Sequence, residues 1–226
     1  MTAFRLDNLE HRQGDFVMHA NAFRLQRGEI YAVTGPNGCG KTSLLRVLSL
    51  LGRPASGQVY CDGSGVDFDD GPELLRARRR IAYLMQQPYL FNMTVYDNIA
   101  YGLHLRNTPA ATRRKRVRDA IDRLKLGDYA RRNAHTLSGG EAQRVAVART
   151  LVLDAEVFLL DEFTAGIDQD YVRAVESYVC DINRETGATV VFTTHSKSQA
   201  HRLSRNHVSI VDGEVCHLSL EDPVEM

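Results

Sequence analysis

The 226-residue sequence has no tryptophan, only four cysteines, no excess charge of either sign and no long apolar run. Its 28 basic and 28 acidic residues cancel, which argues against a general attraction of the whole chain to nucleic acid or anionic lipid. No segment approaches the roughly 18 apolar residues of a membrane-spanning helix. The cysteines are far apart and form no Cys-x-x-Cys pair, which is typical of reduced thiols rather than of a zinc site or disulfide framework. The first twelve residues carry charges where a secretory signal would be apolar, so we expect a cytoplasmic protein.

From residue 30 onward, short apolar runs alternate with segments of helical periodicity. This alternation predicts an α/β fold, with a mostly parallel sheet covered by helices. The apolar stretches 4–6 and 16–18 predict a small antiparallel β layer at the N-terminus. We expect strands over residues 30–34, 81–85, 157–161, 189–193 and 208–211, and helices over 42–51, 170–184 and 197–203.

The segment between residues 95 and 135 interrupts the alternation, because it contains no strand candidate. Pro109 is typical of a helix N-terminus, and Val117, Ile121 and Leu124 recur at helical spacing. We therefore expect a helical subdomain inserted into the core. The predicted division is a core of residues 1–88 and 136–218 and an insertion of 89–135, within a single domain of 1–226.

The predicted insertion is strongly basic. Residues 101–135 contain 10 Lys or Arg against 3 Asp or Glu. The basic run over residues 113–118 could contact phosphates or lipid headgroups, but a solvated outer helix face is the interpretation we favour.

A glycine-rich loop lies between the strand predicted at 30–34 and the next helix, and it matches the pattern G-x-x-x-x-G-K-[ST]. Glycines lack a Cβ, so consecutive backbone N–H groups can converge on phosphate oxygens at the positive end of the following helix. Lys41 is expected to reach the β- and γ-phosphates, and the Thr42 hydroxyl to ligate Mg²⁺. The loop therefore predicts a site for ATP and Mg²⁺. Its residues are Gly35, Pro36, Asn37, Gly38, Cys39, Gly40, Lys41, Thr42 and Ser43.

Two carboxylates directly follow the apolar run 157–160 and should lie at the carboxyl edge of the sheet, where open α/β sheets bind ligands. We expect Asp161 to hold Mg²⁺ and Glu162 to be the general base for an attacking water. A plain acidic turn is the alternative, which would be favoured if Lys41 were absent.

A third motif, Leu137-Ser138-Gly139-Gly140-Glu141-Ala142-Gln143, predicts a second anion site. Ser138 and Glu141 have the spacing of a capping box, so Gly139 and Gly140 should expose free N–H groups at a helix N-terminus. With the phosphate loop and the carboxylate pair, this motif resembles the signature of the ATP-binding cassette (ABC) family, from about residue 4 to residue 218. The resemblance implies a head-to-tail homodimer, in which each signature closes on the ATP bound by the other chain.

The resemblance extends to three further residues. Gln86 resembles the glutamine that senses Mg²⁺ and water, although the adjacent Gln87 leaves the register open. His195 resembles the histidine that contacts the γ-phosphate and the catalytic glutamate, and Asp168 resembles an aspartate that reaches across the dimer.

Two departures from the family pattern stand out. Phe163 occupies a position that is usually proline, which should place a bulky ring beside the loop that carries Asp168. This departure leaves open how fast the chain hydrolyses ATP. Gln13 falls where an aromatic residue usually stacks on adenine, with His11 or Phe16 as possible substitutes.

The resemblance implies the ATP-hydrolysing subunit of a membrane transporter, bound peripherally to the inner face of the cell membrane. Residues 90–103 are similar to short importer cassettes that serve oxyanions such as tungstate, although exporters share the catalytic motifs. Expected partners are integral membrane permease subunits and, indirectly, an extracytoplasmic solute-binding protein, with no direct nucleic acid. The permease should contact exposed apolar residues at 88–91, and no regulatory domain is expected after Leu218.

Two other functions remain open. One is a soluble ABC ATPase acting on nucleic acid or ribosomes, supported by the basic run over 113–118. The other is a nucleotide-gated scaffold that barely hydrolyses ATP, motivated only by Phe163.

Overall fold

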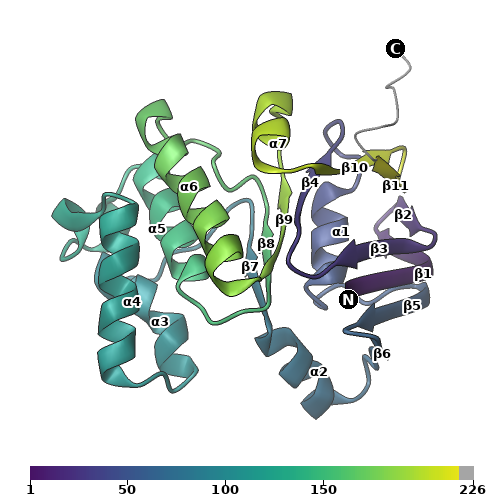
Figure 1. Ribbon diagram of the computed structural model, residues 1–226, viewed down its shortest axis with the longest axis horizontal. Helices are drawn as coiled ribbons and strands as arrows, with labels where there is room; N and C mark the ends of the chain where they lie inside the picture. The colour runs from purple at the N-terminus through teal and green to yellow at the C-terminus, as the bar shows by residue number, and fades with distance from the viewer. Residues whose placement is uncertain (219–226) are drawn as a thin grey trace.

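A single curled sheet forms the centre of the protein in the computed structural model, which describes residues 1–218 (Figure 1). The strands are β1 (Thr2–Gln13), β2 (Phe16–Ala20), β3 (Phe23–Gln26), β4 (Ile30–Thr34), β5 (Ser56–Cys61), β6 (Ser64–Gly65), β7 (Ile81–Leu84), β8 (Val157–Leu160), β9 (Thr189–Thr193), β10 (Asn206–Val211) and β11 (Glu214–Leu218). Their order is β6-β5-β1-β2-β11-β10-β4-β9-β8-β7, and β3 pairs with β1 outside this path. The predicted α/β fold class is confirmed by this topology.

The strands β10, β4, β9, β8 and β7 form the parallel part of the sheet. Successive residues of β8 are buried on opposite faces: Phe158 and Leu160 belong to one apolar core, Val157 and Leu159 to the other. A strand covered on both faces needs apolar side chains at every position, which explains its unbroken apolar sequence.

The antiparallel strands predicted near the N-terminus are present, but they continue the same sheet instead of forming a separate layer. β11 returns antiparallel to β10 and meets β2 at Glu214 and His19, so the two parts are joined edge to edge. The backbone N–H of His19 also donates to the Gly213 carbonyl, at 2.8 Å. Sequence periodicity could not show this joint, because it depends on two residues almost 200 positions apart.

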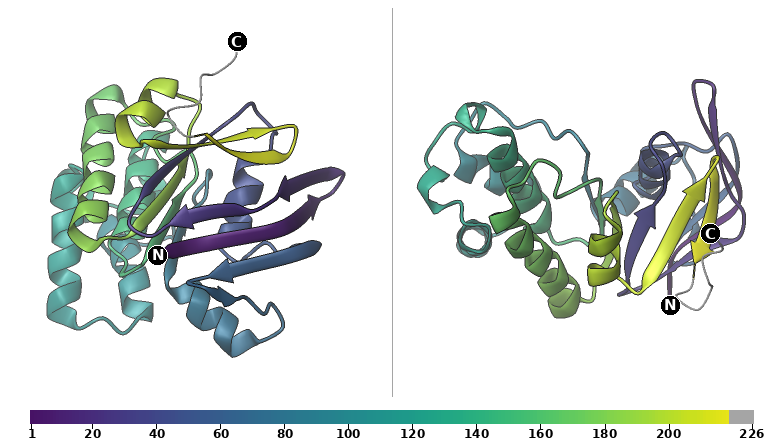
Figure 2. Two further views of the ribbon diagram at one scale, coloured as in Figure 1. Left: turned by 45° about the vertical axis from the view of Figure 1, so that its right-hand side comes forward. Right: turned by 90° about the horizontal axis from the view of Figure 1, so that it is seen from above.

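Helices cover both faces of the parallel strands (Figures 1 and 2). One helix, α1, lies between these strands and the antiparallel part, while α3, α4, α5 and α6 lie on the opposite face. The helices are α1 (Lys41–Leu48), α2 (Gly71–Arg79), α3 (Val95–Leu105), α4 (Ala110–Arg123), α5 (Gly139–Leu151), α6 (Gln169–Thr186) and α7 (Lys197–Leu203), with short 3-10 turns at Gly127–Tyr129 and Ala134–Thr136. Within residues 1–218, none of the helices is long and apolar enough to cross a membrane.

Residues 95–123 form two helices, α3 and α4, that pack on each other and on α5. Thr94 caps α3 by accepting from the Asp97 N–H at 3.1 Å, and Pro109 occupies the cap position of α4. Val117 and Ile121 are buried, as their spacing predicted. The boundaries 89 and 135 of the insertion stay a prediction, and residues 219–226 of the predicted domain lie outside the described residues.

Most predicted elements are shifted by only a few residues, and α1 shows why. Sequence apolarity predicted a helix to residue 51, but α1 ends at Leu48 because Leu50 adopts a left-handed backbone, with φ of 60°. The N–H groups of Leu51 and Gly52 then return to the Arg46 carbonyl, which closes the helix end.

Candidate active site

The carboxyl ends of four neighbouring parallel strands bring the predicted site together. Strands β4, β9, β8 and β7 lie side by side in this order, and their ends are level: Val33 pairs with Thr193, and Leu160 lies between Phe192 and Leu84. The loops that follow these ends carry the phosphate loop, His195, the carboxylate pair and Gln86 in turn. The strand order therefore brings four distant sequence motifs to the same edge of the sheet, where such sheets bind ligands.

The phosphate loop folds closely around its own glycines. Gly35 and Gly40 have φ values of 151° and 113°, which favour glycine. A Cβ on Gly40 would lie 2.8 Å from the Phe16 ring. Lys41 is buried, and its Nζ donates to the carbonyl oxygens of Gly35 at 3.0 Å and Pro36 at 2.9 Å. The loop thus holds a buried ammonium group at the N-terminus of α1, an arrangement suited to binding phosphate.

Asp161 is buried and accepts a hydrogen bond on each carboxylate oxygen. The hydroxyl of Thr42 donates to Oδ2 at 2.8 Å, and the hydroxyl of Thr193 donates to Oδ1 at 2.6 Å. Because the Thr42 proton is used by Asp161, the lone pairs of the Thr42 oxygen remain available to a cation. A hydroxyl and a carboxylate form the hard oxygen set that Mg²⁺ prefers, so these two residues fit the predicted metal.

Glu162 has a different environment from its neighbour. Its backbone is left-handed, with φ of 47°, and its N–H donates to the Thr193 hydroxyl at 2.8 Å. The Oε1 atom lies 2.7 Å from Nε2 of His195, whose side chain is 44% exposed. The two adjacent carboxylates therefore differ in their contacts: Asp161 accepts from Thr42, whereas Glu162 contacts His195.

Both burial and the negative charge of the nearby Asp161 affect the pKa of Tyr83. Burial, and after it the negative charge of Asp161, raise the pKa of the Tyr83 phenol well above its usual value. The phenol therefore stays protonated and uncharged beside Asp161.

A cleft of about 350 Å³ lies over the phosphate loop and Glu162. The exposed Gln86 lines it beside Thr42 and Glu162, whereas Gln87 is not among the described residues that line it. The cleft is lined by Gln13, Phe16, Asn37, Gly38, Gly40, Lys41, Thr42, Ser43, Gln86 and Glu162.

The structure distinguishes between the residues considered for stacking on adenine, His11, Gln13 and Phe16. His11 is buried and its Nδ1 atom lies 3.1 Å from the Arg53 carbonyl oxygen, so the alternative that placed it against adenine is wrong. Phe16 and Gln13 both line the cleft, and Gln13 Oε1 accepts from the Ser43 hydroxyl at 3.5 Å. Phe16 is the ring that the fold brings to the phosphate loop.

The signature motif forms the predicted capping box at the start of α5. The Ser138 N–H donates to the Glu141 carboxylate at 2.8 Å, and this bond lowers the pKa of Glu141. Gly139 and Gly140 form the first turn of the helix, and a Cβ on Gly140 would overlap the Gly166 carbonyl oxygen. Within residues 1–218, the signature does not line the cleft of its own chain.

The loop after Glu162 is held against α5. Phe163 is fully buried and its ring packs edge-on against Phe192, with centroids 5.6 Å apart. The ring lies in the apolar core that Ile167, a neighbour of Asp168, also enters. Gln143 Nε2 donates to the Phe163 carbonyl at 3.3 Å, and the exposed Asp168 occupies the cap position of α6 without a capping side-chain bond.

We expect Phe163→Ala to lower the free energy of unfolding by about 3–5 kcal/mol, because a fully buried ring leaves a cavity. Chemical denaturation of the nucleotide-free chain measures this change. Tyr89→Ala is the control, since this side chain is 66% exposed and its loss should change the free energy by less than about 1 kcal/mol. Equal changes in both variants would contradict the buried position of Phe163.

The loop at 88–91 is only partly exposed. Tyr89 is exposed, but Leu90 is buried and Phe91 is half-buried, with its ring 4.5 Å from the Tyr101 ring. The expectation of exposed apolar side chains along the whole segment was therefore wrong for Leu90, which packs with α3 in the helical core.

Thr193 is the site residue that sequence reasoning missed. Its hydroxyl connects Asp161 and Glu162 although it lies more than 30 positions away in the chain. A threonine that ends an apolar strand two residues before His195 was the available signal.

Comparison with known proteins identifies the family. The family model described as "ABC transporter" matches residues 18–165. The chain belongs to the ABC transporter family. Among ABC relatives, it is 37% identical over 202 residues to the tungstate uptake system ATP-binding protein TupC of Peptoclostridium acidaminophilum, covering 89% of this chain and 91% of the relative. It is 38% identical over 211 residues to the phosphate import ATP-binding protein PstB 2 of Natronomonas pharaonis, covering 89% and 74%.

The fold agrees with solved ABC cassettes. A dimeric structure of the ATP-binding cassette MJ0796, in a post-hydrolysis state with ADP and Pi, has a TM-score of 0.84 at 28% identity, covering 97% of this chain and 99% of that one. The chain is thus an ATPase of the ABC family, as its motifs predicted. The two relatives are named for different solutes, tungstate and phosphate, so these similarities do not identify a single solute.

Proposed function

We propose that this chain is the ATP-binding and hydrolysing subunit of a membrane importer, acting as a homodimer on the inner face of the cell membrane. The observation that supports hydrolysis most strongly is the contact between Glu162 and His195, whose facing atoms lie 2.7 Å apart, because Glu162 also lines the cleft over the phosphate loop. A nucleotide-gated scaffold would have no need of a carboxylate and an imidazole arranged to accept a proton.

Hydrolysis would use the groups that the fold brings to the cleft. Lys41 and the loop N–H groups bind and orient the phosphates, while Thr42 and Asp161, with Gln86 beside them, would hold Mg²⁺. When bound, Mg²⁺ would neutralise charge on the phosphates. Glu162 accepts the proton of the attacking water, and His195 holds Glu162 in place and can donate to the transferred phosphoryl group.

The second half of each site would come from a second copy of the chain. Ser138, Gly139 and Gly140 form an N-terminal helix turn suited to an anion, yet they do not line their own cleft among the residues described. A head-to-tail dimer gives the signature a phosphate to bind, with Asp168 at the junction. The ABC cassette structure similar to this chain is dimeric, which supports a dimer of this chain.

We expect the transporter to import a small solute or an oxyanion such as tungstate. The support is the tungstate relative, of which the alignment covers 91%. Permease subunits in the membrane would contact the surface near Tyr89 and Phe91, and an extracytoplasmic solute-binding protein would act on them from the other side. The permease, rather than this chain, would select the solute.

We propose that Phe16 stacks on the adenine ring. Phe16→Ala should weaken ATP binding by about 10-fold, the equivalent of one lost aromatic stack. Titration with a fluorescent ATP analogue measures the dissociation constant, and Phe16→Tyr should retain most of the affinity. An unchanged constant in Phe16→Ala would assign adenine to Gln13 or another residue.

Purification of the native complex tests the proposed function. The full chain, carrying an affinity tag, is extracted in detergent and its partners are identified by mass spectrometry. Integral membrane subunits that stimulate its ATPase activity in liposomes would support the importer. Ribosomes or DNA in their place would support the alternative function, for which Arg114, Lys115 and Arg118 provide an exposed basic surface on α4.

A further inference from the structure

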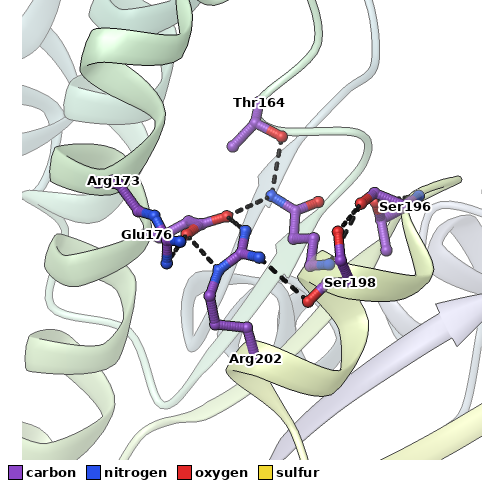
Figure 3. A network of polar contacts seen from close by, with 8 residues as sticks. Thr164, Arg173, Glu176, Ser196, Ser198 and Arg202 are labelled. Atoms are coloured by element: carbon purple, nitrogen blue, oxygen red, sulfur yellow. Dashed lines mark hydrogen bonds and ion pairs between the residues drawn. The ribbon is translucent and has the colours of Figure 1, made fainter.

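A network of polar side chains lies between helices α6 and α7 (Figure 3), and it lines a hollow that Glu162 and His195 also line. At its centre is Glu176 of α6, of which only 3% is exposed. Arg202 of α7 donates to both carboxylate oxygens, from Nε at 3.0 Å and from Nη2 at 2.5 Å. The bond to Glu176 raises the pKa of the Arg202 guanidinium. The buried charge is therefore paired and hydrogen-bonded, as its burial requires.

The network extends from this ion pair to the loop after Glu162. Gln199 of α7 is also buried, and its Nε2 atom donates to Glu176 at 3.1 Å and to the Thr164 hydroxyl oxygen at 2.9 Å. A carboxylate can only accept hydrogen bonds, so Glu176 requires the NH₂ side of the Gln199 amide to face it. The same NH₂ group then reaches Thr164, which means that the Glu176–Arg202 pair fixes the orientation of the amide.

The amide joins the two segments that carry the reacting side chains. Thr164 follows Glu162 by two residues, and its carbonyl accepts from the Ile167 N–H within the same turn. On the other side, the Gln199 N–H donates to the capping hydroxyl of Ser196, the residue next to His195. One side chain thus connects the turn that follows Glu162 to the helix that follows His195, without itself lining the phosphate cleft.

We propose that Gln199 is a positioning residue for ATP hydrolysis, whose amide keeps Glu162 and His195 in register by tying Thr164 to α7. The inference rests on the proposed function, because it gives the tie a role in that reaction. Loss of the hydrogen bond between Gln199 and Thr164 lets the turn at 163–167 move relative to α7. Glu162 then spends less time in its contact with His195. ATP binding, which uses the phosphate loop on the other side of Glu162, is unaffected.

Substitutions at the two ends of the tie test this proposal in the full chain. Gln199→Met and Thr164→Val each remove the bond while keeping much of the side-chain shape, and each should lower kcat about 5-fold with KM for ATP unchanged. The double variant should match the single variants, because both substitutions break the same bond. Thr164→Ser keeps the hydroxyl and should retain wild-type kcat. Arg173→Ala is the matched control, since Arg173 approaches Glu176 at 3.8 Å from an exposed position.

Amide hydrogen exchange provides a readout that is independent of turnover. In the nucleotide-free protein, exchange at residues 163–167 should be about 5-fold faster in Gln199→Met and Thr164→Val than in wild type or Arg173→Ala. Multiplicative losses of kcat in the double variant, a raised KM, or unchanged exchange would overturn the positioning role. A wild-type chain without ATPase activity but with the expected exchange pattern would instead count against the proposed function alone.

Discussion

Glu162→Gln should lower the rate of ATP hydrolysis by about 1,000-fold while leaving ATP bound, because an amide cannot accept the proton of the attacking water. Glutamine has the same shape as glutamate, and its carbonyl oxygen can still accept a hydrogen bond from His195. In the wild-type protein, His195 Nε2 lies 2.7 Å from Glu162 Oε1. Since ATP stays intact at the interface, the variant should form a stable dimer with Mg-ATP. Phosphate release measures turnover, and light scattering measures the mass in solution.

Glu156→Gln is the matched control for this variant. Glu156 lies just before β8, at the end of the strand opposite Glu162, where it pairs with Arg27 and Arg80 at the surface. Its substitution should leave turnover within about 2-fold, because exposed ion pairs contribute little. If Glu162→Gln hydrolysed ATP at the rate of Glu156→Gln, the base would have to be another residue.

Lys41→Ala should weaken ATP binding at least 100-fold, the effect of losing about two charge-assisted hydrogen bonds to phosphate oxygens. The ammonium group is already held at the phosphate loop by the carbonyls of Gly35 and Pro36, so the wild-type protein orders it before ATP arrives. Equilibrium titration with ATP measures the loss of affinity.

The unfolding transition serves as a check on Lys41→Ala, because removal of its two bonds to the loop could also disturb the fold. We expect a thermal midpoint within a few degrees of wild type in the absence of ATP. Lys115→Ala, a substitution on the exposed face of α4, should bind ATP normally. Normal ATP binding by Lys41→Ala would contradict the assignment of the phosphate loop.

Most of the candidate site could be predicted from short motifs in the sequence. The phosphate loop and the carboxylate pair each follow directly from an apolar strand, so their position at the sheet edge could be derived from the sequence. The capping box at Ser138 was equally accessible, because its donors and acceptors lie three residues apart.

Contacts across the fold could not be derived in this way. The bond from Thr193 to Asp161 requires β8 and β9 to be neighbours, and hydrophobic periodicity does not give strand order. The Gln199 network depends likewise on α6 and α7 meeting, and the burial of Leu90 depends on how α3 returns over its own preceding loop. The Thr193 and Gln199 bonds are long-range contacts between segments whose local structure was largely anticipated, whereas the burial of Leu90 and the early end of α1 depend on residues nearby in the chain.

The backbone contact between Gly140 and Gly166 has a consequence for the dimer. Gly140 is in the turn proposed to meet the partner's nucleotide, whereas Gly166 is four residues beyond this chain's own Glu162. Since there is no room for even a methyl group between them, a shift of one must displace the other. Binding of nucleotide at one site of the dimer should therefore alter the rate of hydrolysis at the second site. The two sites should hydrolyse ATP cooperatively rather than independently.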